Sequence, residues 1–72
     1  MFLIKRVRFT GGSVALWEVI EENKQSSFLV ETYIGGKRNS TSVALDLKSA
    51  EKMMKQTVAW LKEKISKALG GK

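Results

Sequence analysis

The chain has no cysteine, no histidine and no proline among its 72 residues. Without cysteine it can form no disulfide, and without cysteine or histidine it lacks the ligands of an ordinary zinc site. The same absences remove the usual nucleophile and general base, and the acidic residues show no metal-binding spacing. We therefore expect no enzyme activity, no cofactor and no small-molecule substrate.

Long apolar runs are missing as well. The apolar start, Met1 to Ile4, is interrupted at once by Lys5 and Arg6. This pattern predicts neither a signal peptide nor a membrane span. We therefore expect an intracellular protein that does not associate with a membrane.

Acidic residues are few: seven, against 13 lysines and arginines, which gives a net charge of +6. Such a charge on a short chain favours a polyanionic partner such as nucleic acid, although a lysine-rich surface can also serve solubility alone. The length of the chain predicts a single domain, residues 1–72. A domain of this size buries only about 60% of the surface that its unfolded chain exposes. Self-association would add buried area, so we also expect a homodimer.

Helical periodicity is confined to the last third of the chain, from Ser49 to Leu69. Its apolar residues recur mostly every three or four positions, the spacing of one helical stripe: Ala50, Met54, Val58, Leu61, Ile65, Ala68 and Leu69. Ser49 is the predicted cap of the first turn and Gly70-Gly71 the predicted stop. A helix of this kind needs an apolar surface to pack on.

Four strand-like segments precede the helix: Met1 to Thr10, Ser13 to Glu22, Ser27 to Ile34 and Thr41 to Leu47. Turns are predicted at Gly11-Gly12, at Asn23 to Gln25 and around Arg38-Asn39. The sequence therefore predicts an α+β fold, a four-stranded antiparallel meander followed by one C-terminal helix.

These turns fix the expected pairing of the strands. They set Phe9 opposite Val14, Ile20 opposite Phe28, and Ile34 opposite Val43. One face of the sheet then becomes apolar and is predicted to receive the helix: Leu3, Val7, Phe9, Val14, Leu16, Ile20, Phe28, Val30, Ile34, Val43, Leu45 and Leu47.

The other face cannot be covered by the same helix and is predicted to be open. It gathers basic and aromatic side chains, which we assign as candidate nucleic-acid-binding residues: Arg6, Arg8, Trp17 and Tyr33, with Lys37 and Arg38 at a hairpin tip. Bases stack on aromatic rings while arginine and lysine neutralise phosphates, and Arg6 beside Trp17 would hold a stacked base. Alternatively, Arg6 only stacks on Trp17 within the fold, and Glu31 on this face opposes the assignment.

Two further segments have two interpretations each. Residues 35–42 form either a mobile basic finger that clamps phosphate or a plain hairpin loop. Trp60 and Met53 flank the helical stripe and either pack at the margin of the sheet or anchor a dimer.

The order of elements resembles the single-stranded-DNA-binding group that includes transcriptional positive cofactor four and, more distantly, the Whirly and Pur-alpha proteins. The local likeness is Val43 to Glu51, where the last strand runs straight into the helix. The family's tryptophan-bearing lead into the helix and its proline-glycine-lysine loop are missing here. The resemblance implies homodimers whose curved sheets bind unpaired strands through basic and aromatic residues.

We therefore expect a non-catalytic protein that binds nucleic acid, with single strands preferred. The alternative is a small adaptor or inhibitor that binds a partner protein through the exposed sheet face or the edge strand Met1 to Phe9.

Overall fold

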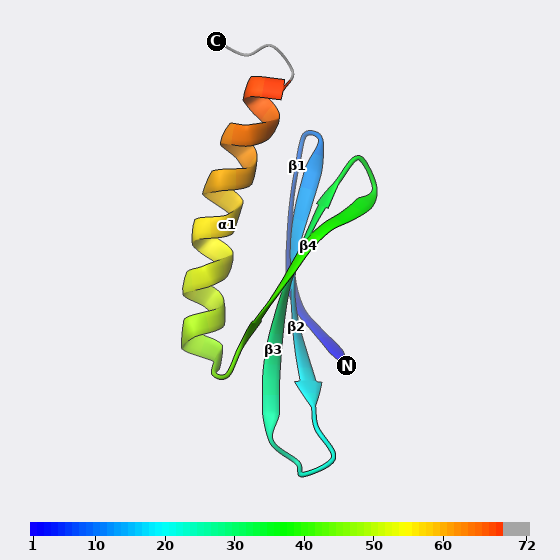
Figure 1. Ribbon diagram of the computed structural model, residues 1–72, viewed down its shortest axis with the longest axis vertical. Coiled ribbons are helices and arrows are strands. Elements are labelled where there is room, and N and C mark those ends of the chain that lie inside the picture. Colours follow the sequence, from blue (N-terminus) through cyan, green and yellow to red (C-terminus); the bar gives the residue numbers. More distant parts are fainter. Residues whose placement is uncertain (69–72) are drawn as a thin grey trace.

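The computed structural model describes residues 1–68 and shows four strands followed by one helix (Figure 1). In chain order the elements are β1 (Phe2–Phe9), β2 (Gly12–Ile20), β3 (Ser26–Ile34), β4 (Lys37–Ala44) and α1 (Leu47–Ala68). The strands form one antiparallel sheet in the order β1-β2-β3-β4. The predicted fold class, an antiparallel meander followed by a C-terminal helix, is confirmed. The predicted helix end at Leu69 and the Gly70-Gly71 stop lie outside the described residues.

The core lies between α1 and one face of the sheet. It joins buried side chains of the strands to those of the helix: Val14, Leu16, Phe28, Val30, Ala44, Ala50, Met54, Leu61 and Ile65. The four helical members of this cluster all belong to the predicted stripe, whereas Ala68 is exposed. The helical period therefore predicted the packing face of α1 correctly. Within residues 1–68, no helix has the length and apolar character to cross a membrane.

The connection between β1 and β2 differs from the prediction. Thr10 and Gly11 form the turn, with Gly11 at a φ of 88°, and Gly12 is the first residue of β2, opposite Phe9. A Cβ on Gly12 would lie 2.7 Å from the carbonyl oxygen of Tyr33, so glycine is needed for the close approach of β3 and not for the turn. The register is thus shifted by two residues from the predicted Phe9–Val14 pair.

A β-bulge at Ile4 changes the direction of the first residues of β1. The pairing shifts between Leu3 and Lys5, so that Lys5 faces Leu16 while Leu3 faces Trp17. One extra residue exchanges the two faces of a strand on one side of the bulge. Leu3, predicted in the core, therefore lies on the face away from α1 and is 46% exposed.

The loop between β2 and β3 spans residues 21–25 and is thus longer than the predicted turn at Asn23 to Gln25, and Lys24 takes a positive φ of 65°. The register again differs by two residues, because Ile20 lies opposite Ser26 and not Phe28. A shift of two keeps every side chain on its predicted face. Phe28 remains in the core, while Ile20 lies at the sheet end and is 53% exposed.

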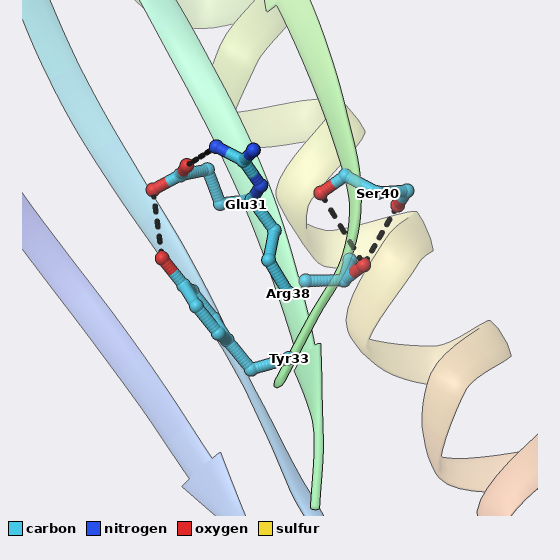
Figure 2. Close-up of polar contacts among 5 residues, drawn as sticks. Glu31, Tyr33, Arg38 and Ser40 are labelled. Atoms are coloured by element: carbon cyan, nitrogen blue, oxygen red, sulfur yellow. Dashed lines mark hydrogen bonds and ion pairs between the residues drawn. The ribbon is translucent and has the colours of Figure 1, made fainter. Parts of the chain in front are cut away.

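The fourth strand was predicted wrongly, because the turn before it is Gly35-Gly36 and not Arg38-Asn39. Both glycines have positive φ, 60° and 82°, and β4 starts directly after them. A second bulge, at Asn39, lies between the pairs Tyr33–Arg38 and Thr32–Ser40. The Thr32 and Ser40 hydroxyls are 2.7 Å apart and join the strands beside this bulge (Figure 2).

The bulge at Asn39 places Ala44 in the core instead of its neighbour Val43. Val43 faces away from α1 and is 59% exposed. Leu45 and Leu47, predicted in the same core row, lie beyond the end of β4 and are 83% and 41% exposed. The predicted core face is therefore correct for β2 and β3 but wrong for β4.

The helix begins two residues before the predicted cap. Asp46 and not Ser49 is the N-cap: its Oδ1 accepts the Ser49 backbone N–H at 2.7 Å, and its Oδ2 accepts the Ser49 hydroxyl at 3.0 Å. Such a cap satisfies a backbone donor that has no partner within the helix. The backbone and side-chain hydrogen bonds from Ser49 lower the pKa of Asp46 below its ordinary value of 3.8.

Asp46→Ala is expected to lower the melting temperature, because Ser49 N–H loses its acceptor. The folded-state pKa of Asp46 is depressed, so the carboxylate stabilises the fold above its unfolded pKa and this contribution is lost as pH falls through the folded pKa. The difference in melting temperature between wild type and Asp46→Ala should thus be largest at neutral pH and should become smaller well below pH 3.8. Asp46→Asn is the control, because asparagine caps without titrating. A difference independent of pH would contradict this account.

Candidate nucleic-acid interface

The sheet face turned away from α1, called the open face here, is organised in rows of paired residues that run across all four strands. The first polar row is Arg8, Ser13, Tyr33 and Arg38, and the second is Arg6, Ala15, Glu31 and Thr41. The third, called the apolar row, is Leu3, Trp17, Leu29 and Val43. Directly paired residues share a face of the sheet. The open face is thus divided into a basic half near the glycine turns and an apolar half.

The polar rows are joined by a network around Glu31, which is only 7% exposed. Tyr33 donates its hydroxyl to Glu31 Oε1 at 3.1 Å, and Arg38 Nη1 lies 3.5 Å from Glu31 Oε2 (Figure 2). On the other side, the Arg6 guanidinium lies 5.9 Å from the centre of the Tyr33 ring. Glu31, which counted against a basic surface in the sequence, therefore holds two of its members in place.

The environment of Tyr33 raises the pKa of its hydroxyl. Burial raises the pKa of this hydroxyl above its ordinary value of 10.0, and the hydrogen bond to Glu31 and the charge of Glu31 raise it further. Arg6 and Arg38 act in the opposite direction. Tyr33 thus remains a neutral donor to Glu31, with its ring available beside Arg6.

A shallow pocket of about 520 Å³ lies at the glycine-turn end of the sheet. Basic, aromatic and glycine residues of both hairpins line it: Arg6, Arg8, Phe9, Gly11, Gly12, Ser13, Tyr33, Gly35 and Gly36. Arg6 and Arg8 are exposed, and neither makes an ion pair within residues 1–68. Both guanidinium groups are therefore available for an anion in a pocket that Tyr33 also lines.

The apolar row crosses the sheet next to the arginines. Leu3 and Val43 are 46% and 59% exposed, and Trp17 and Leu29 between them are half-buried. The indole N–H of Trp17 is buried and has no hydrogen-bond partner within the described residues. The Trp17 ring thus contributes apolar and aromatic surface, and its indole N–H holds no other described residue by a hydrogen bond.

Four of the six predicted binding residues are brought together. Arg6, Arg8, Tyr33 and Arg38 form one basic cluster on the open face. Trp17 is on the same face but in the apolar row. Arg6 pairs with Ala15 and stacks on Tyr33, so the predicted pairing of Arg6 with Trp17 and the predicted stacking of Arg6 on Trp17 are wrong.

Lys37 and Arg38 do not form a hairpin tip. They are the first residues of β4, paired with Ile34 and Tyr33, so residues 35–42 are neither a mobile finger nor a long loop. Successive strand residues point to opposite faces. Lys37 therefore lies on the α1 side of the sheet, away from the basic cluster that contains Arg38.

The sequence prediction missed the apolar row. The bulge at Ile4 turns Leu3, and the bulge at Asn39 turns Val43, from the predicted core face to the open face. The available signal is Leu29, which alternates with Phe28 and Val30 in the sequence and therefore falls on the open face. An apolar residue on a face predicted to be open, beside Trp17, indicates a wider apolar surface.

Met53 and Trp60, which flank the helical stripe, lie in different environments. Met53 packs against the core, whereas Trp60 is 50% exposed and Lys64 Nζ lies 4.9 Å from its ring centre. Packing at the sheet margin thus describes Met53 but not Trp60, which lines a shallow pocket with Glu63, Lys64 and Lys67 on the surface of α1.

Comparisons with protein-family models, with curated proteins and with solved structures found no match to this chain. The resemblance to positive cofactor four and its relatives therefore stays a prediction from the order of elements. What the chain binds has to be argued from the chemistry of its own surface.

Proposed function

We propose that this chain is a non-catalytic protein that binds single-stranded nucleic acid on its open face. The observation that carries this proposal is the adjacency of two arginine-bearing rows and an apolar row with a tryptophan at its centre, all on a sheet face that α1 does not cover (Figure 1). Phosphates are the anionic groups and bases the aromatic groups of a nucleic-acid strand, and the two halves of the open face match them.

The basic half would bind the sugar-phosphate backbone. Arg6 and Arg8 are exposed and unpaired within residues 1–68, and the Arg38 side chain is 65% exposed although it contacts Glu31. Arginine binds phosphate through two parallel N–H donors, which gives both attraction and orientation. The overall charge of +6 would draw a polyanion to this side of the sheet.

The apolar half would receive the bases. Stacking of a base on an aromatic side chain contributes about 1–3 kcal/mol and does not depend on base identity. In a duplex the faces of the bases are already stacked on each other and are not available to Trp17. This difference favours single strands with little sequence preference.

Self-association and an intracellular location complete the proposal. Large apolar side chains remain exposed outside the open face, at the start of β1 and on α1: Met1, Phe2, Leu47 and Trp60. A chain of this size gains stability by burying such residues against a second copy. An intracellular location is proposed because a nucleic-acid partner would be found inside the cell.

The first test is the salt dependence of strand binding by Arg6→Gln/Arg8→Gln. Each phosphate contact to a single strand contributes about −0.7 to the slope of log K against log salt. Removing two arginines should make this slope shallower by about 1.4 while the fold is retained. The slope is measured by fluorescence titration of a mixed-sequence single strand and its duplex at several salt concentrations.

Lys64→Gln/Lys67→Gln is the matched control, because it removes the same charge from the surface of α1 at a distance from the open face. It should leave the slope unchanged. Equal effects of the two double variants would mean that only net charge matters. Binding of a protein ligand without salt dependence, and of no strand, would replace this proposal with the adaptor alternative.

A further inference from the structure

The side of α1 that faces β1 carries a row of lysines. Lys48, Lys52, Lys55 and Lys62 are separated by four, three and seven residues, which places them along one side of a helix. All four are exposed. This side is distinct from the core stripe and from the Trp60 surface of α1.

Three of these lysines line a groove of about 500 Å³ between α1 and β1. The remaining lining comes from both elements: Lys5 and Val7 of β1, and Glu51 and Val58 of α1. The groove exists because α1 packs on β2, β3 and β4, and leaves the same side of the edge strand β1 largely uncovered. Val7 and Val58 form an apolar floor between the charged side chains.

The charges of the groove are unbalanced. Four lysines and a single glutamate, Glu51, line it. Within residues 1–68 the ion pairs are Arg38–Glu31 and Lys67–Glu63, so no groove lysine is paired. Cations gathered over a low-dielectric wall raise the local concentration of an anionic ligand. The groove therefore favours an anion with several charges.

The lysine row of α1 approaches the arginines of the open face at Lys62, beyond the end of the groove, and the groove itself approaches them at Lys5. Lys62 Nζ lies 5.7 Å from the centre of the Phe9 ring, and Phe9 also lines the pocket that contains Arg6 and Arg8. Along β1, Lys5 and Arg6 are consecutive and point to opposite faces of the edge strand. A chain of cations thus passes around β1 from the open face to the α1 side.

We infer that the groove between β1 and α1 binds phosphates of the same nucleic-acid strand, so that a long strand passes around β1 from the open face. This inference rests on the proposed function. Lysine is a point charge without the fork geometry of arginine, so the groove would hold the backbone without fixing a base. Its contribution should appear only when the strand is longer than the open face can hold.

The test compares Lys52→Gln/Lys55→Gln with Lys64→Gln/Lys67→Gln, which remove equal charge from the groove and from the Trp60 surface of the same helix. Strands of about 4 and about 16 nucleotides span the range of single-domain binding sites. With the long strand, Lys52→Gln/Lys55→Gln should make the salt slope shallower by about 1.4, and with the short strand it should have no effect. Lys64→Gln/Lys67→Gln should change neither.

Amide chemical shifts of the ¹⁵N-labelled wild-type chain separate the outcomes. Shifts of open-face amides with both strands, and of groove amides with the long strand only, would support the inference. Open-face shifts alone, with an unchanged slope for Lys52→Gln/Lys55→Gln, would overturn the inference and leave the proposed function standing. Groove shifts alone would overturn the open face as the site, and no shift in either region would overturn both proposals.

Discussion

Leu61→Ala should lower the free energy of unfolding by about 2–5 kcal/mol, the cost of removing a fully buried leucine from a core. Leu61 is 0% exposed and lies in the cluster that joins α1 to β2 and β3. A chain of 72 residues has a total stability of roughly 4–11 kcal/mol at the usual value per residue. The Leu61 side chain alone would thus contribute a large part of the free energy that stabilises the packing of α1 on the sheet.

Urea denaturation at fixed protein concentration measures this effect, and Leu45→Ala is the matched control. Leu45 is 83% exposed, so the same substitution there should change stability by less than about 0.5 kcal/mol. Equal losses at the two positions would mean that Leu45 is buried against another copy of the chain. A near-neutral Leu61→Ala would mean that α1 packs through a different side.

The architecture could be predicted because each element has a clear period. The spacings of four, seven and four residues between Ala50, Met54, Leu61 and Ile65 define one side of a helix, and all four are buried. The alternation in β2 and β3 likewise placed Val14, Leu16, Phe28 and Val30 on the core face. Periodicity is a property of each segment alone, so a wrongly predicted turn does not change the type of element or the buried face that it predicts for that segment.

The registers could not be predicted from the same pattern. A shift of two residues leaves every side chain on its face, so Phe9 opposite Val14 and Phe9 opposite Gly12 satisfy the alternation equally. What decides between them is three-dimensional: a Cβ at Gly12 would lie 2.7 Å from the Tyr33 carbonyl oxygen. That contact is visible only when β3 is in place.

The start of β4 shows a different limit. Its residues 37–42 are all polar, so they provide no alternation from which a strand could be recognised. The bulge at Asn39 then exchanges the faces of the apolar residues that follow, and Ala44 replaces Val43 in the core. For the candidate site, the face of Arg6, Arg8, Trp17 and Tyr33 followed from alternation alone, whereas the apolar row depended on two bulges.

Trp17→Ala should weaken single-strand binding by about 1–3 kcal/mol, a roughly 5- to 150-fold loss of affinity. Trp17 is at the centre of the apolar row, flanked by Leu3 and Leu29 and next to the arginine rows. Loss of its ring removes the aromatic surface on which a base would stack, while the phosphate contacts remain. The affinity should therefore fall without a change in the salt slope, which distinguishes this variant from Arg6→Gln/Arg8→Gln.

Two controls make the Trp17 result specific. Trp17→Phe keeps an aromatic ring and removes an indole N–H that has no partner within the described residues, so it should retain the fold and most of the affinity. Trp60→Ala removes an equally large ring from the surface of α1 and should leave binding unchanged. In a Trp60→Phe background, quenching of the remaining tryptophan by the strand reports contact at Trp17 directly. Wild-type affinity in Trp17→Ala would show that the bases do not use the apolar row, and would assign that row to a protein partner or a second copy of the chain.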